Sequence, residues 1–127
     1  MEKKIFKTDK VFDDGGPYSQ AVIAGKMVFL SGQAAVDPKK MKPVQGGIEG
    51  QTRTTFNNIS TILEEAGSSL DQVVKVLIFL NDIKDYTVAN RVYREYFPKN
   101  FPARTCVEAH LEEGYLIEVE VVALLPD

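Results

Sequence analysis

Cysteine, histidine and tryptophan are scarce in this sequence, whose 127 residues include one Cys, one His and no Trp. A single Cys cannot form a disulfide within the chain, which weakly favours a reducing compartment. One Cys and one His cannot provide a Cys-x-x-Cys or paired-His spacing, so we expect no metal site. A Ser-His-Asp triad would need His110, and the polar run 110–114 instead predicts a solvated turn or strand end there.

The sequence also lacks a phosphate-binding glycine motif, an excess of positive charge and a long apolar run. Its net charge is −3, with Lys and Arg interspersed among Asp and Glu, so we do not expect nucleic acid as a partner. The longest apolar stretch, Val73–Leu80, is interrupted by Lys75 and is too short to span a bilayer. Residues 1–7 lack the apolar core of a signal peptide. We therefore expect no membrane partner and a cytoplasmic location.

What is present is the composition of an ordinary globular protein, with 44% apolar and 26% charged residues. The chain contains no internal repeat and no linker, and its length suits one hydrophobic core. We expect a single domain over residues 1–127.

Hydrophobic periodicity and turn residues divide the chain into eight elements. Ile48, Phe56 and Leu63 fall on one helical face, and Gly67 follows as a helix stop. Asp85 is a candidate cap for a second helix. The expected elements are strands at 5–7, 21–24 and 27–31, a helix at 48–66, a strand at 73–80, a helix at 85–97, and strands at 104–109 and 116–125.

Two helices can cover only one face of a mixed sheet formed by these strands. Yet Val73–Leu80 is apolar on both of its faces, and Val122 and Leu124 share a side with Glu118 and Glu120. An uncovered apolar face predicts a homo-oligomer. The alternative is a monomer whose loops cover that face.

Arg104 is the strongest candidate for ligand binding. It lies at a strand start in the run 102–106, where Pro102 stiffens the approach. A guanidinium presents its donors in a fixed fork that matches the two oxygens of a carboxylate. The alternative is a structural Arg paired with a carboxylate of the chain itself.

Other candidates depend on strand alternation. Glu118 and Glu120 share one face of their strand, either as a solvated face or, if partly buried, as acids with raised pKa. Cys106 shares a side with Arg104, and no base is evident to activate it, so a small buried hydrophobe is expected. Tyr18 follows a Gly-Pro turn and could close a pocket. The run Ser31-Gly32-Gln33 ends a strand, where a Gly lets a ligand approach the backbone.

Taken together, these motifs resemble the RidA/YjgF family over essentially the whole chain. The motifs are Gly-Pro-Tyr-Ser-Gln-Ala at 16–21, Ser-Gly-Gln at 31–33, Asn-Arg-Val-Tyr at 90–93 with Tyr96-Phe97, Pro-Ala-Arg-Thr-Cys at 102–106 and Ile-Glu-Val-Glu at 117–120.

The resemblance implies a chorismate-mutase-like α+β fold, with a mixed six-stranded sheet and two helices on one face. It also implies a homotrimer whose sheets form a central barrel, with ligand sites in the clefts between subunits.

The implied activity is that of an enamine/imine deaminase. It hydrolyses 2-imino acids derived from 2-aminoacrylate (2-iminopropanoate and 2-iminobutanoate) to 2-keto acids and ammonia, which protects pyridoxal-phosphate enzymes, and the protein itself needs no cofactor. By the same resemblance Arg104 binds the carboxylate and Glu118 orients or activates water. The residues implied to line the pocket are Tyr18, Ser31, Gly32, Asn90 and Cys106.

Two departures from the family pattern concern the acid. His110-Leu111-Glu112 stands where the family has Arg-Leu-Pro, and the stretch from Arg104 to Glu118 is one residue shorter than expected. A one-residue slip turns strand side chains to the other face, so Glu120 stays an alternative to Glu118. Two other functions also stay open: an endoribonuclease that inhibits translation, and a non-catalytic regulator that binds small acids.

Overall fold

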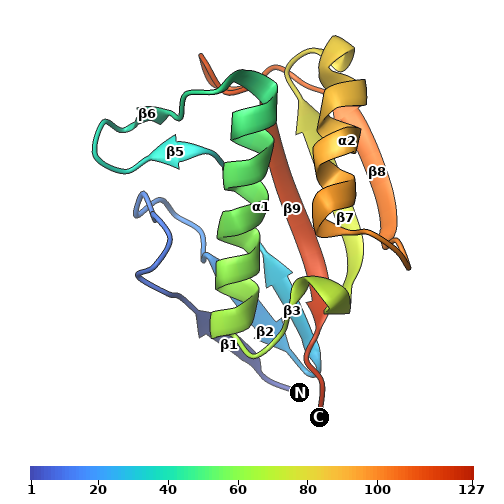
Figure 1. Cartoon of the computed structure of the whole chain (residues 1–127). Coiled ribbons are helices and arrows are strands. Elements are labelled where there is room, and N and C mark those ends of the chain that lie inside the picture. Colours follow the sequence, from blue (N-terminus) through green and yellow to red (C-terminus); the bar gives the residue numbers. More distant parts are fainter.

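The computed structural model describes residues 1–127 as two helices packed side by side on one face of a sheet (Figure 1). Neither helix is long and apolar enough to cross a membrane. The helices are α1 (Gly47–Glu65) and α2 (Tyr86–Tyr96), with short 3-10 helices η1 (Leu70–Gln72) and η2 (Ile83–Asp85). The strands are β1 (Lys3–Phe6), β2 (Ala21–Ala24), β3 (Met27–Leu30), β4 (Gln33–Ala34), β5 (Val36–Asp37), β6 (Lys42–Pro43), β7 (Val73–Leu80), β8 (Ala103–Glu108) and β9 (Ile117–Leu124).

The sheet has the order β1-β2-β3-β9-β7-β8, so the mixed α+β fold expected from the motifs is confirmed. Every pair along it is antiparallel except β7 with β8, which are parallel. The six strands of this path are those expected. A seventh, the two-residue β4, pairs with β9 beyond the end of β3. It is too short to show a periodicity in the sequence, as are β5 and β6, which form a separate hairpin.

The end of α1 at Gly67 is confirmed. Gly67 has a φ of 94°, a left-handed conformation that costs a glycine little. Two backbone bonds close the helix: Gly67 N donates to Glu64 O at 3.1 Å, and Ser68 N donates to Leu63 O at 2.8 Å. The chain can therefore turn directly into η1 and β7.

The start of α2 differs from the expectation. Asp85 precedes the helix, but its side chain makes no capping hydrogen bond, so the prediction that Asp85 caps α2 is wrong. Asp82 does the capping one turn earlier, where its carboxylate accepts from Lys84 N at 2.9 Å and begins η2. Glu108 Oε1, from β8, also accepts from Ile83 N at 2.8 Å. The turn of η2 supplies the entry to α2 and ties it to the edge strand.

The core lies between the helices and the sheet. Alternate residues of β7 and β9 face the helices and are buried there, together with the inner face of α1. Phe56 contacts the rings of Tyr93, Tyr96 and Phe97, with centroids 5.5 to 5.7 Å apart. These ring contacts fix α2 against α1, and so fix the α2 residues described below.

The opposite face of the sheet is not covered by any element of the chain (Figure 1). Phe29, Val107 and Leu124 lie on it with 41%, 39% and 39% of their surfaces exposed. The loops of the chain do not cover this face, so the alternative of a monomer whose loops cover it is wrong. An exposed apolar sheet face of this kind is typical of an interface.

Candidate functional site

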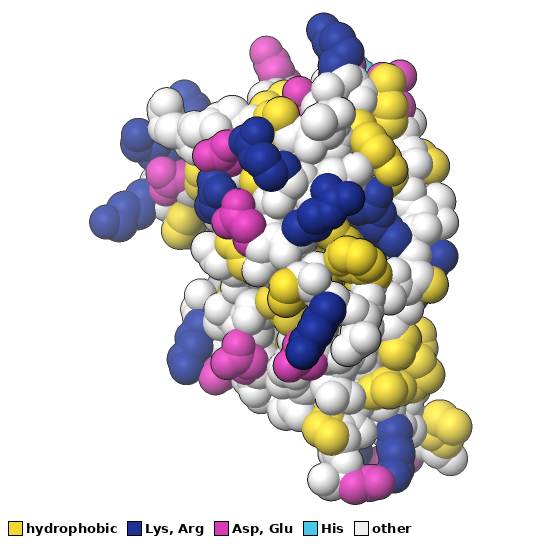
Figure 2. Space-filling view, turned by 45° about the vertical axis from the view of Figure 1, so that its right-hand side comes forward, with side chains coloured by type: hydrophobic (Ala, Val, Ile, Leu, Met, Phe, Trp, Pro, Cys, Tyr) yellow, Lys and Arg dark blue, Asp and Glu magenta, His cyan; other side chains and the backbone are white.

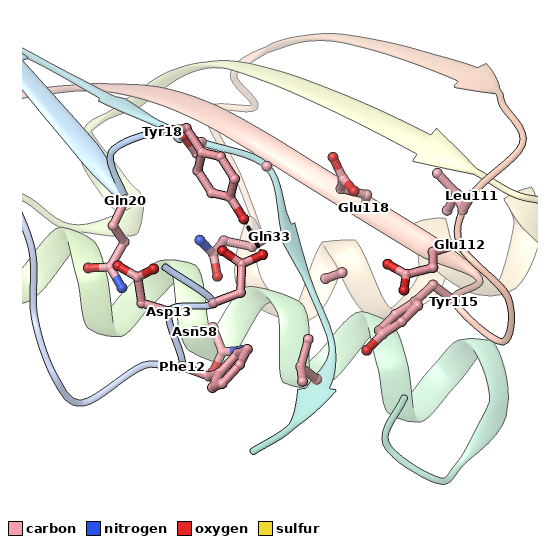
Figure 3. Close-up of a pocket in the computed structure, with 15 residues that line it drawn as sticks. Phe12, Asp13, Tyr18, Gln20, Gln33, Asn58, Leu111, Glu112, Tyr115 and Glu118 are labelled. Atoms are coloured by element: carbon pink, nitrogen blue, oxygen red, sulfur yellow. Dashed lines mark hydrogen bonds between the residues drawn. The ribbon is translucent and has the colours of Figure 1, made fainter. Parts of the chain in front are cut away.

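A cavity of about 220 Å³ lies where the loop after β1, the end of β3 and the segment 111–118 meet. Four carboxylates line it, from Asp13, Asp14, Glu112 and Glu118, and no Lys or Arg does. We call this cavity the acidic hollow. Figure 3 shows Tyr18 and Glu118 on either side of the strand that carries Gln33. Of the residues that the sequence singled out, the acidic hollow brings together Tyr18, Ser31, Gly32 and Glu118.

Glu118 occupies space that only a glycine at position 32 leaves free. A Cβ atom placed on Gly32 would lie 2.3 Å from Glu118 Oε2, far inside van der Waals contact. Partial burial raises the pKa of the Glu118 carboxyl, and the negative charge of nearby Glu120 raises it further. Glu120 does not line the acidic hollow.

The Tyr18 hydroxyl donates a hydrogen bond to the carboxylate of Asp14, four residues earlier. Asp14 also accepts from Gly16 N at 2.8 Å, so one side chain holds both the turn and the ring. The bond to Asp14 raises the pKa of Tyr18 to about 12, so its hydroxyl stays neutral. Ser31 Oγ donates to Ser19 O at 2.6 Å and fastens the same turn to β3.

A second cavity, also of about 220 Å³, lies between α2 and β8 on the helix-covered side of the sheet. We call it the basic hollow. It is lined by Tyr86, Asn90, Tyr93, Arg94, Phe101 and Arg104, which include two cations and no carboxylate. Arg104 and Asn90 are the members that the sequence had singled out.

Arg104 is held by aromatic residues rather than by an acid. Its Nη2 donates to Tyr86 Oη at 3.1 Å, and its Cζ lies 4.7 Å from the ring centroid of Tyr93. None of the seven ion pairs of the chain includes Arg104. The alternative of a structural Arg paired with an internal carboxylate is therefore wrong, and the positive charge is available to an external one.

Cys106 and His110 line neither hollow. Cys106 lies on the same side of β8 as Arg104, as alternation predicted, and is half-buried. Burial raises the pKa of its thiol, an effect that the Arg104 charge opposes. The thiol is therefore not an activated nucleophile. His110 is exposed, as expected for a solvated turn.

Arg104 and Glu118 face opposite sides of the same sheet. Arg104 is in register with Val76, which is fully buried beneath the helices. Glu118 is in register with Phe79 and alternates along β9 with residues buried under the helices, so it faces the uncovered side. The two residues that the resemblance assigns to catalysis cannot meet within one chain.

Several residues of the two hollows were not singled out from the sequence. Asp14 could have been predicted from the sequence, because an acid shortly before a Gly-Pro turn can accept hydrogen bonds from the backbone of that turn. Glu112 and Arg94 had none, since their positions depend on how the loop 109–116 and α2 meet the sheet. Tyr86 was also missed, and Tyr93 was named only as part of the motif at 90–93.

Comparison with known proteins places the chain in a family. The family model described as Endoribonuclease L-PSP matches residues 8–125. A RutC family protein of Pyrococcus abyssi is 44% identical over 124 residues, which cover 97% of this chain and 98% of that protein. The human 2-iminobutanoate/2-iminopropanoate deaminase is 37% identical over 123 residues, covering 96% of this chain and 90% of that protein. The mitochondrial protein mmf2 of Schizosaccharomyces pombe is 48% identical over 113 residues, covering 86% and 88%.

Solved structures agree with the fold. RidA from an Antarctic Psychrobacter has a TM-score of 0.88 and 37% identity, over 95% of this chain and 98% of that chain. TdcF of E. coli with bound serine has a TM-score of 0.87 and 32% identity, also over 95% and 98%. The chain therefore belongs to the Endoribonuclease L-PSP family, the RidA/YjgF family that its motifs resemble.

Proposed function

We propose that this chain is an enamine/imine deaminase that hydrolyses 2-iminopropanoate and 2-iminobutanoate to 2-keto acids and ammonia. The observation that carries the proposal is Arg104, a partly buried cation with no carboxylate partner in its own chain. A 2-imino acid supplies the missing carboxylate. The relatives named as deaminases, with 37% identity in the human case, support the same chemistry.

Arg104 binds the substrate carboxylate in this proposal. A guanidinium that is already held by Tyr86 and Tyr93 loses little further freedom when a ligand binds. A charge-assisted hydrogen bond of this type contributes about 1.5–3 kcal/mol. Asn90 lies in the same hollow and offers an amide to the ligand.

Glu118 handles the protons. Hydrolysis adds water to the C=N carbon to give a carbinolamine, and the C–N bond then breaks to leave C=O and ammonia. The ionised carboxylate accepts the proton of the attacking water and passes it to the departing nitrogen. The raised pKa of Glu118 makes it a stronger base for the first step. Positioned acid–base help of this kind contributes roughly 10²–10⁴-fold.

The site is shared between copies of the chain. Because Arg104 and Glu118 face opposite sides of the sheet, a complete site needs the basic hollow of one copy against the acidic hollow of another. The uncovered apolar face supplies the surface for such an assembly, and the family resemblance implies a homotrimer. Tyr18, Ser31 and Gly32 would then reach the ligand from the same copy as Glu118.

A mixing experiment tests the proposal. 2-Aminoacrylate is generated from serine by a dehydratase, and release of the keto acid is followed with and without the protein. We expect Arg104→Ala and Glu118→Gln each to be inactive as pure variants. Oligomers formed from an equal mixture of the two should regain about a quarter of the parental activity if each site takes one residue from each of two copies.

Three results would contradict parts of this proposal. Full activity of Arg104→Ala would remove the carboxylate anchor. No recovery in mixed oligomers would remove the shared site. Tight binding of 2-ketobutyrate without imine hydrolysis would favour the alternative of a non-catalytic regulator that binds small acids.

The endoribonuclease alternative has one finding in its favour, the description of the matching family model. The lone His110 is exposed and lies in neither hollow, and the net charge is −3. We therefore keep the expectation that nucleic acid is not the main partner. RNA cleavage that co-purifies with the chain and is lost on mutation of a named residue would revive the alternative.

The cytoplasmic location also stays a prediction, and one relative is mitochondrial.

A further inference from the structure

The basic hollow contains a cation that the proposed function does not use. Arg94 lies in the last turn of α2 and lines the hollow with Arg104. It takes part in none of the ion pairs of the chain. Arg94 and Arg104 thus line a hollow to which their own copy contributes no carboxylate, and a ligand with two negative charges would find one guanidinium for each.

Two other basic residues beside α2 pair with acids. Arg91 donates to Glu49 at 2.5 Å, and Arg53 bridges Glu49 and Glu95 at 2.7 Å to each. Glu49 and Glu95 are therefore both paired with Arg residues on the α1 side of α2. Figure 2, which brings the α2 side forward, shows basic side chains lying close together near the middle of this face. Arg94 differs from its helix neighbour Arg91 in making no ion pair.

Tyr93 provides a second sign of a ligand in this hollow. Its side chain is buried, with 4% of its surface exposed, and its hydroxyl has no acceptor, because the Arg104 guanidinium beside it can only donate. Buried hydroxyls are normally paired, so a buried hydroxyl without an acceptor calls for an explanation. A ligand oxygen in the hollow lined by Tyr93 would give this hydroxyl an acceptor.

We propose that the site prefers 2-imino acids with a second carboxylate on the side chain. This inference rests on the proposed function: Arg104 binds the carboxylate next to the imine carbon, and Arg94 binds the carboxylate of the side chain. The reaction is unchanged, since water adds to C=N and ammonia leaves, and the product is a dicarboxylic 2-keto acid. The reaction that supplies such a substrate is the two-electron oxidation of an acidic amino acid to its imine.

Binding of stable keto acids measures this preference directly. Dissociation constants of 2-ketoglutarate and 2-ketobutyrate are determined by calorimetry for the parent oligomer and for Arg94→Gln, Arg91→Gln and Arg104→Gln. We expect the parent to bind the dicarboxylate about five- to tenfold more tightly, since an exposed guanidinium is partly screened. Arg94→Gln should lose that preference and keep its affinity for 2-ketobutyrate. Arg91→Gln, the matched control, should behave as the parent.

Salt and turnover provide two further measurements. The preference should shrink as ionic strength rises, because it depends on one more charge pair. The imine of aspartate, generated by an amino-acid oxidase, should be hydrolysed by the parent with a higher kcat/KM than the imine of alanine, and Arg94→Gln should remove the difference.

The outcomes separate this inference from the proposed function. Equal affinity of the parent for both acids, or an equal loss of both in Arg94→Gln, overturns the dicarboxylate preference and leaves imine hydrolysis intact. Unchanged binding of both acids in Arg104→Gln overturns the carboxylate anchor, and with it both proposals. Each variant is first checked for the oligomeric state of the parent by light scattering.

Discussion

The Glu118 carboxylate lies against Gly32, in space that any larger residue at position 32 would occupy. Gly32 thus acts through its missing side chain, since the backbone there does not need a left-handed conformation. Strand β4, which begins at the next residue, pairs with β9 beside Glu118 and fixes the two residues relative to each other. Size at position 32 is therefore coupled to the position of the acid.

Gly32→Ala is expected to impair activity with little loss of stability. The added Cβ would lie 2.3 Å from Glu118 Oε2, so the carboxylate must move. A displaced proton acceptor should lower kcat by about 10²-fold, while the melting temperature stays within a few degrees of the parent. Glu118→Asp in the Gly32→Ala background shortens the acid and should recover part of the loss in a double-mutant cycle. Parental kcat in Gly32→Ala would contradict this coupling.

Glu118 should give the activity an acidic limb. Because its pKa is raised and the ionised form accepts the proton of water, kcat/KM should fall as the pH drops through that raised pKa. Glu118→Gln should abolish both the limb and the activity. Glu120→Gln, a control outside the acidic hollow, should keep the limb but move it to lower pH, because the Glu120 charge helps to raise the pKa of Glu118. If the residual activity of Glu118→Gln still fell at acidic pH, the limb would belong to another group.

The same group should make stability depend on pH. A raised pKa means that the folded state disfavours the ionised carboxyl, so this contribution to stability is present at low pH and is lost as the pH rises through the raised value. Glu118→Gln should therefore melt at a higher temperature than the parent at neutral pH. The two should converge below about pH 4, where the Glu is protonated in both states. Scanning calorimetry across this range measures the difference.

Tyr86→Phe should weaken substrate binding more than turnover. The substitution keeps the ring and removes the hydroxyl that accepts from Arg104 Nη2 at 3.1 Å. The guanidinium then loses its hydrogen bond to Tyr86 but keeps its contacts with both rings, and KM should rise about threefold to tenfold with kcat nearly unchanged. Tyr96→Phe is the control, since Tyr96 Oη donates to Asn57 and to the backbone of Arg53, and none of these residues lines the basic hollow. Equal kinetics of parent and Tyr86→Phe would contradict the positioning role.

Gln51→Leu should destabilise the fold and loosen the rim of the acidic hollow. Gln51 is buried on α1, donates to Gly114 O at 3.0 Å and accepts from Leu116 N at 2.8 Å. Losing both leaves two backbone groups unpaired, at a cost of about 2–4 kcal/mol in the free energy of unfolding. Urea denaturation measures this cost, and hydrogen exchange should speed up in residues 111–116. Gln51→Glu keeps the acceptor and should be less damaging.

The main elements were predictable because their patterns are local. Gly67 ends α1 as its sequence position indicated, and β7 and β9 lie within a residue of the apolar segments that predicted them. The cap of α2 was not predictable, because Asp82 and Asp85 are equally good capping residues by type. The contact of Glu108 from β8 with Ile83 N favours the earlier turn, and that contact depends on the tertiary fold.

The candidate site was predictable by residue type but not by arrangement. Alternation shows which residues share a face within β8 and within β9. It does not show which face of β8 matches which face of β9, because the loop 109–116 between them has no regular period. The sides of Arg104 and Glu118 therefore became clear only from the register of both strands with β7. The aromatic support of Arg104 also depends on how α2 docks, which the sequence of α2 alone does not determine.

The opposite placement of Arg104 and Glu118 has a consequence for mixed populations of chains. If every site contains Arg104 of one copy and Glu118 of another, a copy that lacks both residues inactivates two sites at once. Activity should then decline as the square of the fraction of intact chains, so a cell with one defective gene copy would lose more than half of the function. Damage to a minority of chains would therefore remove a larger fraction of the activity than the fraction of chains damaged, although each chain still folds.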